Sequence, residues 1–137
     1  MHFKSYYKYQ KIYVFIQKKD EETEMEELLN NIRNLCKKQN NLTETEFKIV
    51  LDHKLYDGQP KTKAVQCYSL CFIKESNIYK DNAPNTKYLQ TILPIFINNK
   101  QKALDDIDKC LKTTGQDDCE RGYNFIHCLV KETGLYM

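Results

Sequence analysis

The sequence lacks most of the features that would assign a function directly. Its 137 residues carry a net charge of only +2, so no overall field favours nucleic acid or an acidic membrane. It contains no G-x-S-x-G, H-E-x-x-H or C-x-x-C motif. No stretch alternates apolar and polar residues with a period of two, which argues against β-sheet. These absences predict an all-α protein that is not an enzyme and has no cofactor, no metal and no nucleic-acid partner.

The beginning of the chain contains no apolar run that could span a membrane. The short run at residues 12–16 follows several lysines. A secretory signal needs an apolar run of roughly 7–15 residues and a small-residue cleavage site. Only the basic start is present, so we expect residues 1–19 to be an N-terminal tail or a degenerate signal segment. Residues 20–137 are expected to form one helical domain.

Six cysteines are present, and an even number in a small polar chain indicates three disulfides made in an oxidising compartment. Cys67 and Cys71 are separated by three residues, so both lie on one face of a helix, one turn apart. A bond between them would be strained, because both side chains lean back along the same face. Each must therefore reach a different partner, and the sequence alone leaves those partners open.

Helical periodicity and boundary signals divide the rest of the chain into six helices. They are expected over about 20–39, 43–51, 61–75, 84–94, 98–111 and 118–131. Thr43 and Glu46 form a capping box, Pro84 is expected to begin the fourth helix, and residues 77–83 to form a loop. Pro94 should kink or end the fourth helix, and residues 113–115 should close the fifth.

Asn41-Leu42-Thr43 also matches the acceptor sequence for N-glycosylation. Thr43 is already explained as a helix cap, so the motif alone does not require that Asn41 carry a glycan.

The cysteine spacing and the sequence around it carry a family resemblance. Thirty, three, thirty-eight, eight and eight residues separate Cys36, Cys67, Cys71, Cys110, Cys119 and Cys128. Two local segments agree as well, Gln66-Cys67-Tyr68-Ser69-Leu70-Cys71-Phe72 and Asp118-Cys119-Glu120-Arg121-Gly122-Tyr123. Over about residues 20–137 the chain resembles the insect odorant-binding protein family of six-cysteine type, which includes pheromone-binding and general odorant-binding proteins. Residues 1–19 depart from the resemblance, because family members begin with a clear secretory signal.

The resemblance implies about six helices around a central apolar cavity, cross-linked by three interlocked disulfides. The implied pairs are Cys36–Cys71, Cys67–Cys119 and Cys110–Cys128. Helix geometry is consistent with them, since nine residues at about 100° each place Cys119 and Cys128 on opposite sides of the last helix.

The resemblance also implies a secreted carrier, as in sensillum lymph, that binds a small hydrophobic odorant, pheromone or fatty-acid-like ligand and delivers it towards a membrane chemoreceptor. We expect a monomer or weak homodimer. The residues expected to line the ligand site are Leu29, Ile32, Val65, Ser69, Phe72, Ile73, Leu93, Ile107, Leu111, Phe125, Ile126, Leu129 and Tyr136, the last as a lid. Each apolar member could equally be ordinary core. Ser69 could offer its hydroxyl to an alcohol or carbonyl, or bond to its own helix.

Two alternatives concern charge. A salivary or venom-type binder of amines or other host-derived small molecules would need carboxylates that face inward, and Asp105, Asp106 and Asp108 crowd the fifth helix. Leu104 and Ile107, however, are the residues expected on its inner face. His53 and His127 are candidates for acid-triggered ligand release, or are simply exposed histidines.

Overall fold

The structure, a computed structural model, describes residues 19–51 and 62–134 and contains six helices in this part of the chain. They are α1 (Lys19–Gln39), α2 (Glu44–Leu51), α3 (Lys63–Glu75), α4 (Thr86–Ile97), α5 (Lys100–Cys110) and α6 (Asp118–Thr133). The all-α prediction is confirmed, and all six expected helices are present. The expected N-terminal segment lies outside the described residues, apart from Lys19 at the start of α1.

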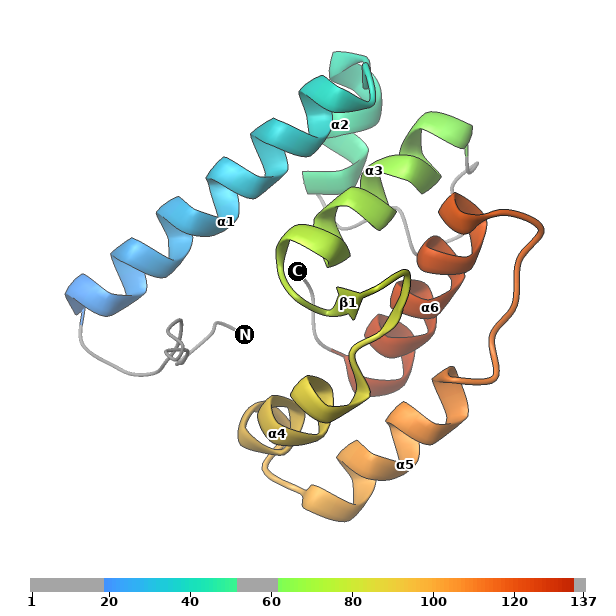
Figure 1. The fold of residues 1–137 in the computed structure, drawn as a ribbon. Coiled ribbons are helices and arrows are strands. Elements are labelled where there is room, and N and C mark those ends of the chain that lie inside the picture. The colour runs from blue at the N-terminus through green and yellow to red at the C-terminus, as the bar shows by residue number, and fades with distance from the viewer. Residues whose placement is uncertain (1–18, 52–61, 135–137) are drawn as a thin grey trace.

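The packing centres on α3 and α6, which run side by side in the middle of the molecule (Figure 1). On one side α5 packs against α6 and α4 packs against α5, while on the other side α1 packs against α3. The core is built from apolar residues of α1, α3, α4, α5 and α6, whereas α2 contributes no buried residue. Residues that are distant in sequence therefore meet between α1, α3 and α6.

A small β-hairpin stands where the sequence predicted only a loop. Strand β1 (Tyr79–Lys80) pairs antiparallel with β2 (Ala83–Pro84), with Tyr79 opposite Pro84. The two residues between the strands, Asp81 and Asn82, have φ values of 54° and 63°. Positive φ at both central positions is typical of a type I′ turn, whose twist matches that of paired strands. The Asn82 side chain donates to Asp118 at 3.0 Å and so anchors the hairpin to the start of α6.

The boundaries of α4 differ from the prediction. Pro84 belongs to β2, and the helix begins two residues later, after Asn85, whose side chain accepts from the N–H of Tyr88. Pro94 lies inside the helix, which continues to Ile97 and ends at Asn98 in the left-handed conformation. Asparagine tolerates this conformation better than most residues, so it can end a helix as glycine does.

The end of α5 is also earlier than predicted, because its C-cap is Leu111 and residues 113–115 lie beyond it. Gly115 has a different role there. A Cβ at this position would come within 2.6 Å of the backbone nitrogen of Arg121. Glycine thus allows the loop to cross the first turn of α6 at close range.

The predicted capping box at the start of α2 is confirmed. The N–H of Glu46 donates to Thr43 Oγ1 at 3.1 Å, and the N–H of Thr43 donates to Glu46 Oε1 at 3.0 Å. The second carboxylate oxygen of Glu46 accepts from the Thr62 hydroxyl at 2.8 Å. Since Thr62 is itself the N-cap of α3, Glu46 links the starts of two helices.

Three disulfides cross-link the helices, in the pairs that the family resemblance implies. Cys36–Cys71 joins α1 to α3, Cys67–Cys119 joins α3 to α6, and Cys110–Cys128 joins α5 to α6. The two cysteines of α3 thus reach different helices, and α6 is fixed on two sides.

Candidate ligand site between the helices

Most residues expected to line a ligand site lie inside the molecule. Nine apolar ones belong to a single buried cluster: Leu29, Ile32, Phe72, Ile73, Leu93, Ile107, Phe125, Ile126 and Leu129. Their exposed fractions are all 8% or lower. The amphipathic pattern of each helix turns these side chains inward, and the disulfides hold the helices together around them. Five helices thus contribute to one apolar interior.

The other apolar members of the predicted set lie elsewhere. Val65 is buried, but it packs with Tyr123 in a separate cluster on the α3–α6 contact. Leu111 is 40% exposed at the C-cap of α5, so the protein encloses it only in part. Tyr136, the predicted lid, lies outside the described residues.

Ser69 is one of three buried polar residues in the described part of the chain, with Gln66 and Asp106. Only 3% of it is exposed, and its neighbours along α3 include buried Phe72 and Ile73. Its Oγ atom is buried and has no hydrogen-bond partner in the described part of the chain. The Ser69 hydroxyl therefore does not bond to the backbone of its own helix. An unpaired buried hydroxyl costs the folded protein about 1–3 kcal/mol.

Two tyrosines of the same buried cluster were not among the residues predicted for the site. Tyr79 is 6% exposed, and its ring lies 5.8 Å from that of Phe125. Tyr68 is 3% exposed and makes an edge contact with Phe47 at 6.2 Å. Burial raises the pKa of Tyr68 to about 12, opposed in part by the positive charge of Arg33. Tyr68 therefore stays a neutral phenol at physiological pH.

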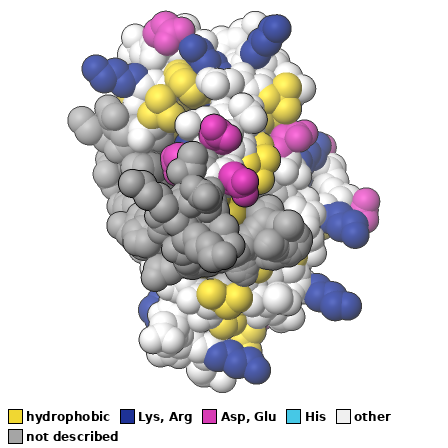
Figure 2. All heavy atoms as spheres, turned by 90° about the vertical axis from the view of Figure 1, so that its left-hand side faces the viewer, with side chains coloured by type: hydrophobic (Ala, Val, Ile, Leu, Met, Phe, Trp, Pro, Cys, Tyr) yellow, Lys and Arg dark blue, Asp and Glu magenta, His cyan; other side chains and the backbone are white. Residues whose placement is uncertain are grey.

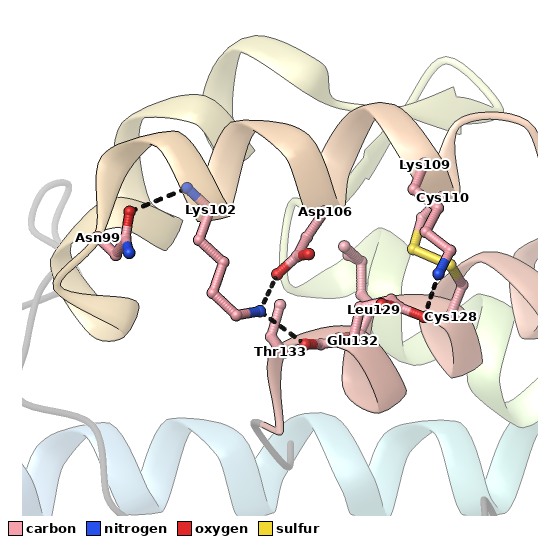
Figure 3. Close-up of polar contacts among 9 residues, drawn as sticks. All are labelled: Asn99, Lys102, Asp106, Lys109, Cys110, Cys128, Leu129, Glu132 and Thr133. Atoms are coloured by element: carbon pink, nitrogen blue, oxygen red, sulfur yellow. Dashed lines mark hydrogen bonds and ion pairs between the residues drawn. A yellow bond between two sulfur atoms is a disulfide. The ribbon is translucent and has the colours of Figure 1, made fainter.

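A polar network joins α5 to the last turn of α6 (Figure 3). Lys102 Nζ lies 2.7 Å from Asp106 Oδ2 and donates to the backbone oxygen of Glu132 at 2.9 Å. Lys109 Nζ lies 2.9 Å from Glu132 Oε2, and this contact lowers the pKa of Glu132 and raises the pKa of Lys109. Asp106 is 8% exposed, so Lys102 neutralises a buried carboxylate. The network fixes the C-terminal end of α6 against α5.

This network bears on the amine-binding alternative. Asp105 and Asp108 are exposed, whereas Asp106 faces α6 and already has the Lys102 ammonium as its partner. Leu104, which was expected on the inner face, is only partly buried. Among the described residues, the buried carboxylate of Asp106 is already paired with Lys102, so no unpaired buried carboxylate is available to bind an amine.

The two histidines proposed as acid sensors are placed differently. His127 lies on α6, where its ring makes an edge contact with Tyr123 at 5.7 Å. His53 lies outside the described residues.

In Figure 2 the visible apolar side chains form separate groups among charged residues. The exposed large hydrophobic residues are Leu28, Leu35, Leu51, Ile95 and Leu111. Within residues 19–51 and 62–134, no helix is long and apolar enough to cross a bilayer. The same segments contain no group of His, Cys, Asp or Glu side chains that could hold a metal ion.

The fold is shared with solved insect proteins. The fatty acid binding protein OBP56a from the oral disk of the blowfly Phormia regina has a TM-score of 0.68 and 22% identity, over 88% of this chain and 97% of that one. The odorant-binding protein dmelOBP28a of Drosophila melanogaster has a TM-score of 0.63 and 20% identity, over 82% of this chain and 94% of that one. Odorant binding protein 5 of Apis mellifera has a TM-score of 0.62 and 22% identity, over 80% of this chain and 88% of that one.

Among curated proteins none matches the sequence, but a family does. The PBP/GOBP family matches residues 18–132. This stretch includes all six cysteines and all of the described helices apart from Thr133, the last residue of α6. This family consists of odorant-binding carriers of small ligands. The resemblance seen in the cysteine spacing is confirmed, and the chain belongs to the PBP/GOBP family.

Proposed function

We propose that this protein is a secreted, non-catalytic carrier that binds a small hydrophobic ligand between its helices and delivers it towards a chemoreceptor. Membership of the PBP/GOBP family supports the carrier role. The observation that carries the proposal for this chain is Ser69 Oγ, a buried hydroxyl without a partner among the described residues. The same helix contributes Phe72 and Ile73 to the buried apolar cluster.

The ligand that fits this arrangement is an apolar chain with one hydrogen-bonding end. Its chain would replace apolar contacts between α1, α3 and α6, and its polar end would bond to Ser69 Oγ. Burial of apolar ligand surface yields roughly 25 cal/mol per Å² before the costs of binding, which is compatible with micromolar affinity. The blowfly neighbour is a fatty acid binding protein, which supports alcohols and acids of fatty-acid type as the first compounds to test.

The test is displacement of a naphthylamine probe from the oxidised protein, with a long-chain alcohol and the alkane of equal length as a matched pair. Ser69→Ala should weaken binding of the alcohol about tenfold, the loss expected for one hydrogen bond, and leave the alkane unchanged. The same variant should stabilise the empty protein, because it removes a buried polar atom that has no partner.

Ser76→Ala is the matched control. Ser76 lies at the end of the same helix, and its hydroxyl already bonds to the backbone oxygen of Phe72 at 2.8 Å. This variant should leave both affinities unchanged. The carrier proposal fails if no alcohol, ester or acid displaces the probe, and displacement by amines alone would replace it with an amine-binding role.

Acid-triggered release is the further part of the proposal. Protonation of His53 and His127 should lower ligand affinity between about pH 7 and pH 5 if it is coupled to release. A double histidine-to-alanine variant should then have a flat profile over this range. If the wild-type profile is already flat, the protein has no such switch.

A further inference from the structure

We propose that Asn41 is an N-glycosylation site, so that the secreted protein carries an oligosaccharide at the corner between α1 and α2. Asn41-Leu42-Thr43 is the sole Asn-x-Ser/Thr acceptor in the sequence. The three disulfides indicate that the chain folds in the oxidising secretory compartment, where this modification takes place. The sequence thus contains the acceptor, and the disulfides indicate that the chain passes through the compartment in which the acceptor is modified.

The local geometry directs Asn41 outward. It follows α1 with a φ of 53° and is exposed, whereas the next residue, Leu42, is only 7% exposed and packs in the core. The amide of the preceding Asn40 donates to the backbone oxygen of Cys36 at 2.9 Å. By contrast, the Asn41 side chain has no hydrogen bond within the described parts of the chain. Asn40 thus caps a backbone carbonyl at the end of α1, whereas the Asn41 side chain is exposed to solvent.

The surroundings have room for a bulky substituent. Thr43, Glu44 and Thr45 are all exposed. Figure 1 places the turn between α1 and α2 at the top of the molecule, far from α4 and α5. A glycan attached there would extend from the end of α1 into solvent and would leave the α5–α6 network uncovered.

The reaction is a glycosyl transfer from a lipid-linked oligosaccharide diphosphate, brought by the cell's transferase. A bond forms between Asn41 Nδ2 and the anomeric carbon of the sugar. The bond from that carbon to the diphosphate oxygen breaks, and the lipid diphosphate leaves with the electron pair. The amide nitrogen gives up one proton to a base of the transferase. No oxidant or reductant is required.

The folded corner also determines when the transfer takes place. In the capping box Thr43 Oγ1 accepts from Glu46, and Lys37 spans the turn to Glu44 at 2.6 Å. In the folded protein Thr43 Oγ1 is therefore engaged in the capping box, and it is not available for binding by the transferase. We infer that Asn41 is modified before α2 forms and before Cys36 pairs with Cys71.

The site is tested by secreting the full chain from insect cells behind a secretory leader and measuring its intact mass before and after peptide-N-glycosidase. Three variants separate the acceptor sequence from the fold. Asn41→Gly removes the acceptor but suits the positive φ, Thr43→Asp removes it but keeps a good N-cap, and Thr43→Ser keeps both. Wild type and Thr43→Ser should carry enzyme-sensitive carbohydrate mass, and the other two variants should lose it completely while keeping the wild-type melting profile.

A wild-type chain secreted at its unmodified peptide mass would overturn the proposal, as would carbohydrate retained on Asn41→Gly. The timing is tested with purified transferase and a lipid-linked oligosaccharide donor. The reduced, unfolded chain should be modified and the oxidised, folded chain should not. Equal modification of both forms would refute the requirement for an unfolded acceptor.

Discussion

Two parts of the molecule differ in how many residues they bury. We call helices α3 to α6 the body and helices α1 and α2 the arm. In the body, α6 alone buries six residues, and two disulfides join α6 to α3 and α5. The arm has one disulfide to the body, and α2 buries no residue. Within residues 24–39 of α1, the part whose burial is described, the buried positions are Leu29, Ile32 and Cys36. The body therefore provides most of the core, and the arm closes over one side of it.

The disulfides test this comparison with the largest effect. Closing loops with sequence separations of 52 and 35 residues, as Cys67–Cys119 and Cys36–Cys71 do, stabilises a fold by about 4 kcal/mol each in the chain-entropy treatment. Replacing both cysteines of the body pair by alanine should lower the global free energy of unfolding by that amount. Replacing the arm pair should mainly expose the amides of α1 to hydrogen exchange.

Hydrogen exchange by mass spectrometry, combined with urea unfolding, separates the two results. Protection of α3 and α6 should persist in the Cys36→Ala, Cys71→Ala variant and fall in the body variant. Equal loss of protection in all helices of the arm variant would mean that arm and body form one cooperative unit.

A smaller effect is expected from adding volume to the contact between α3 and α6. A Cβ at Gly122 would lie 2.8 Å from Leu70 Cδ1 and 3.4 Å from Ile73 Cδ1. Gly122→Val should therefore destabilise the protein by about 1–3 kcal/mol, the usual cost of overpacking. Leu28→Val, at an arm residue that is 39% exposed, should change stability by no more than about 0.5 kcal/mol. Equal melting temperatures for the two variants would contradict the close packing of the body.

The link between α2 and the start of α3 sharpens the comparison from the side of the arm. Glu46→Ala removes the acceptor for both Thr43 and Thr62 and should cost about 1 kcal/mol, as the loss of a helix cap does. Glu46→Gln retains an amide oxygen in the same place and should cost less. Chemical denaturation of the two variants measures the difference, and equal losses would show that charge rather than the acceptor geometry matters.

Acid should produce the smallest effect and should act mainly on the body. Hydrogen bonds from Lys63 and Asn82 lower the pKa of Asp117 and Asp118 respectively, and Lys109 lowers that of Glu132. In the arm, the backbone N–H of Thr43 lowers the pKa of Glu46. A carboxyl whose pKa is lower in the folded state stabilises the folded protein at pH values above the pKa of that carboxyl in the unfolded chain. The unfolded pKa is 3.8 for the aspartates and 4.5 for the glutamates. That contribution disappears as the pH falls through the folded pKa.

Melting temperatures recorded from pH 6 to pH 3 should therefore decrease most steeply below about pH 4.5. Glu132→Gln should make the curve less steep, and Glu24→Gln, at an exposed residue of α1, should leave it unchanged. If Glu132→Gln has the same slope as wild type, the contact with Lys109 does not contribute in solution.

The order of helices could be read from the sequence because each helix repeats its apolar residues at helical spacing. The hairpin at 79–84 could not, since strands of two residues are too short to show a period. Proline is typical of a helix start, but here Pro84 lies in β2 and Asn85 supplies the cap of α4. Leu111 follows the spacing of buried residues, yet the helix ends before it and its side chain turns outward.

The candidate site was predictable only in part. Its apolar members are found by periodicity, but a packed core and a ligand pocket have the same composition. The sequence does not identify Asp106 as an inner residue, because a carboxylate usually faces water, and the pairing with Lys102 appears only in the structure. What distinguishes Ser69 is a hydrogen bond that is missing, and no sequence pattern predicts a missing bond.

The order of the disulfides along the chain has a consequence for proteolysis. Each closed loop overlaps the next, because Cys67 lies within 36–71 and Cys110 lies within 67–119. Any single peptide bond between Cys36 and Cys128 is therefore spanned by at least one disulfide. A protease that cuts once in this stretch leaves two pieces that remain covalently attached, and a carrier in a protease-rich fluid would survive a first cut as one molecule.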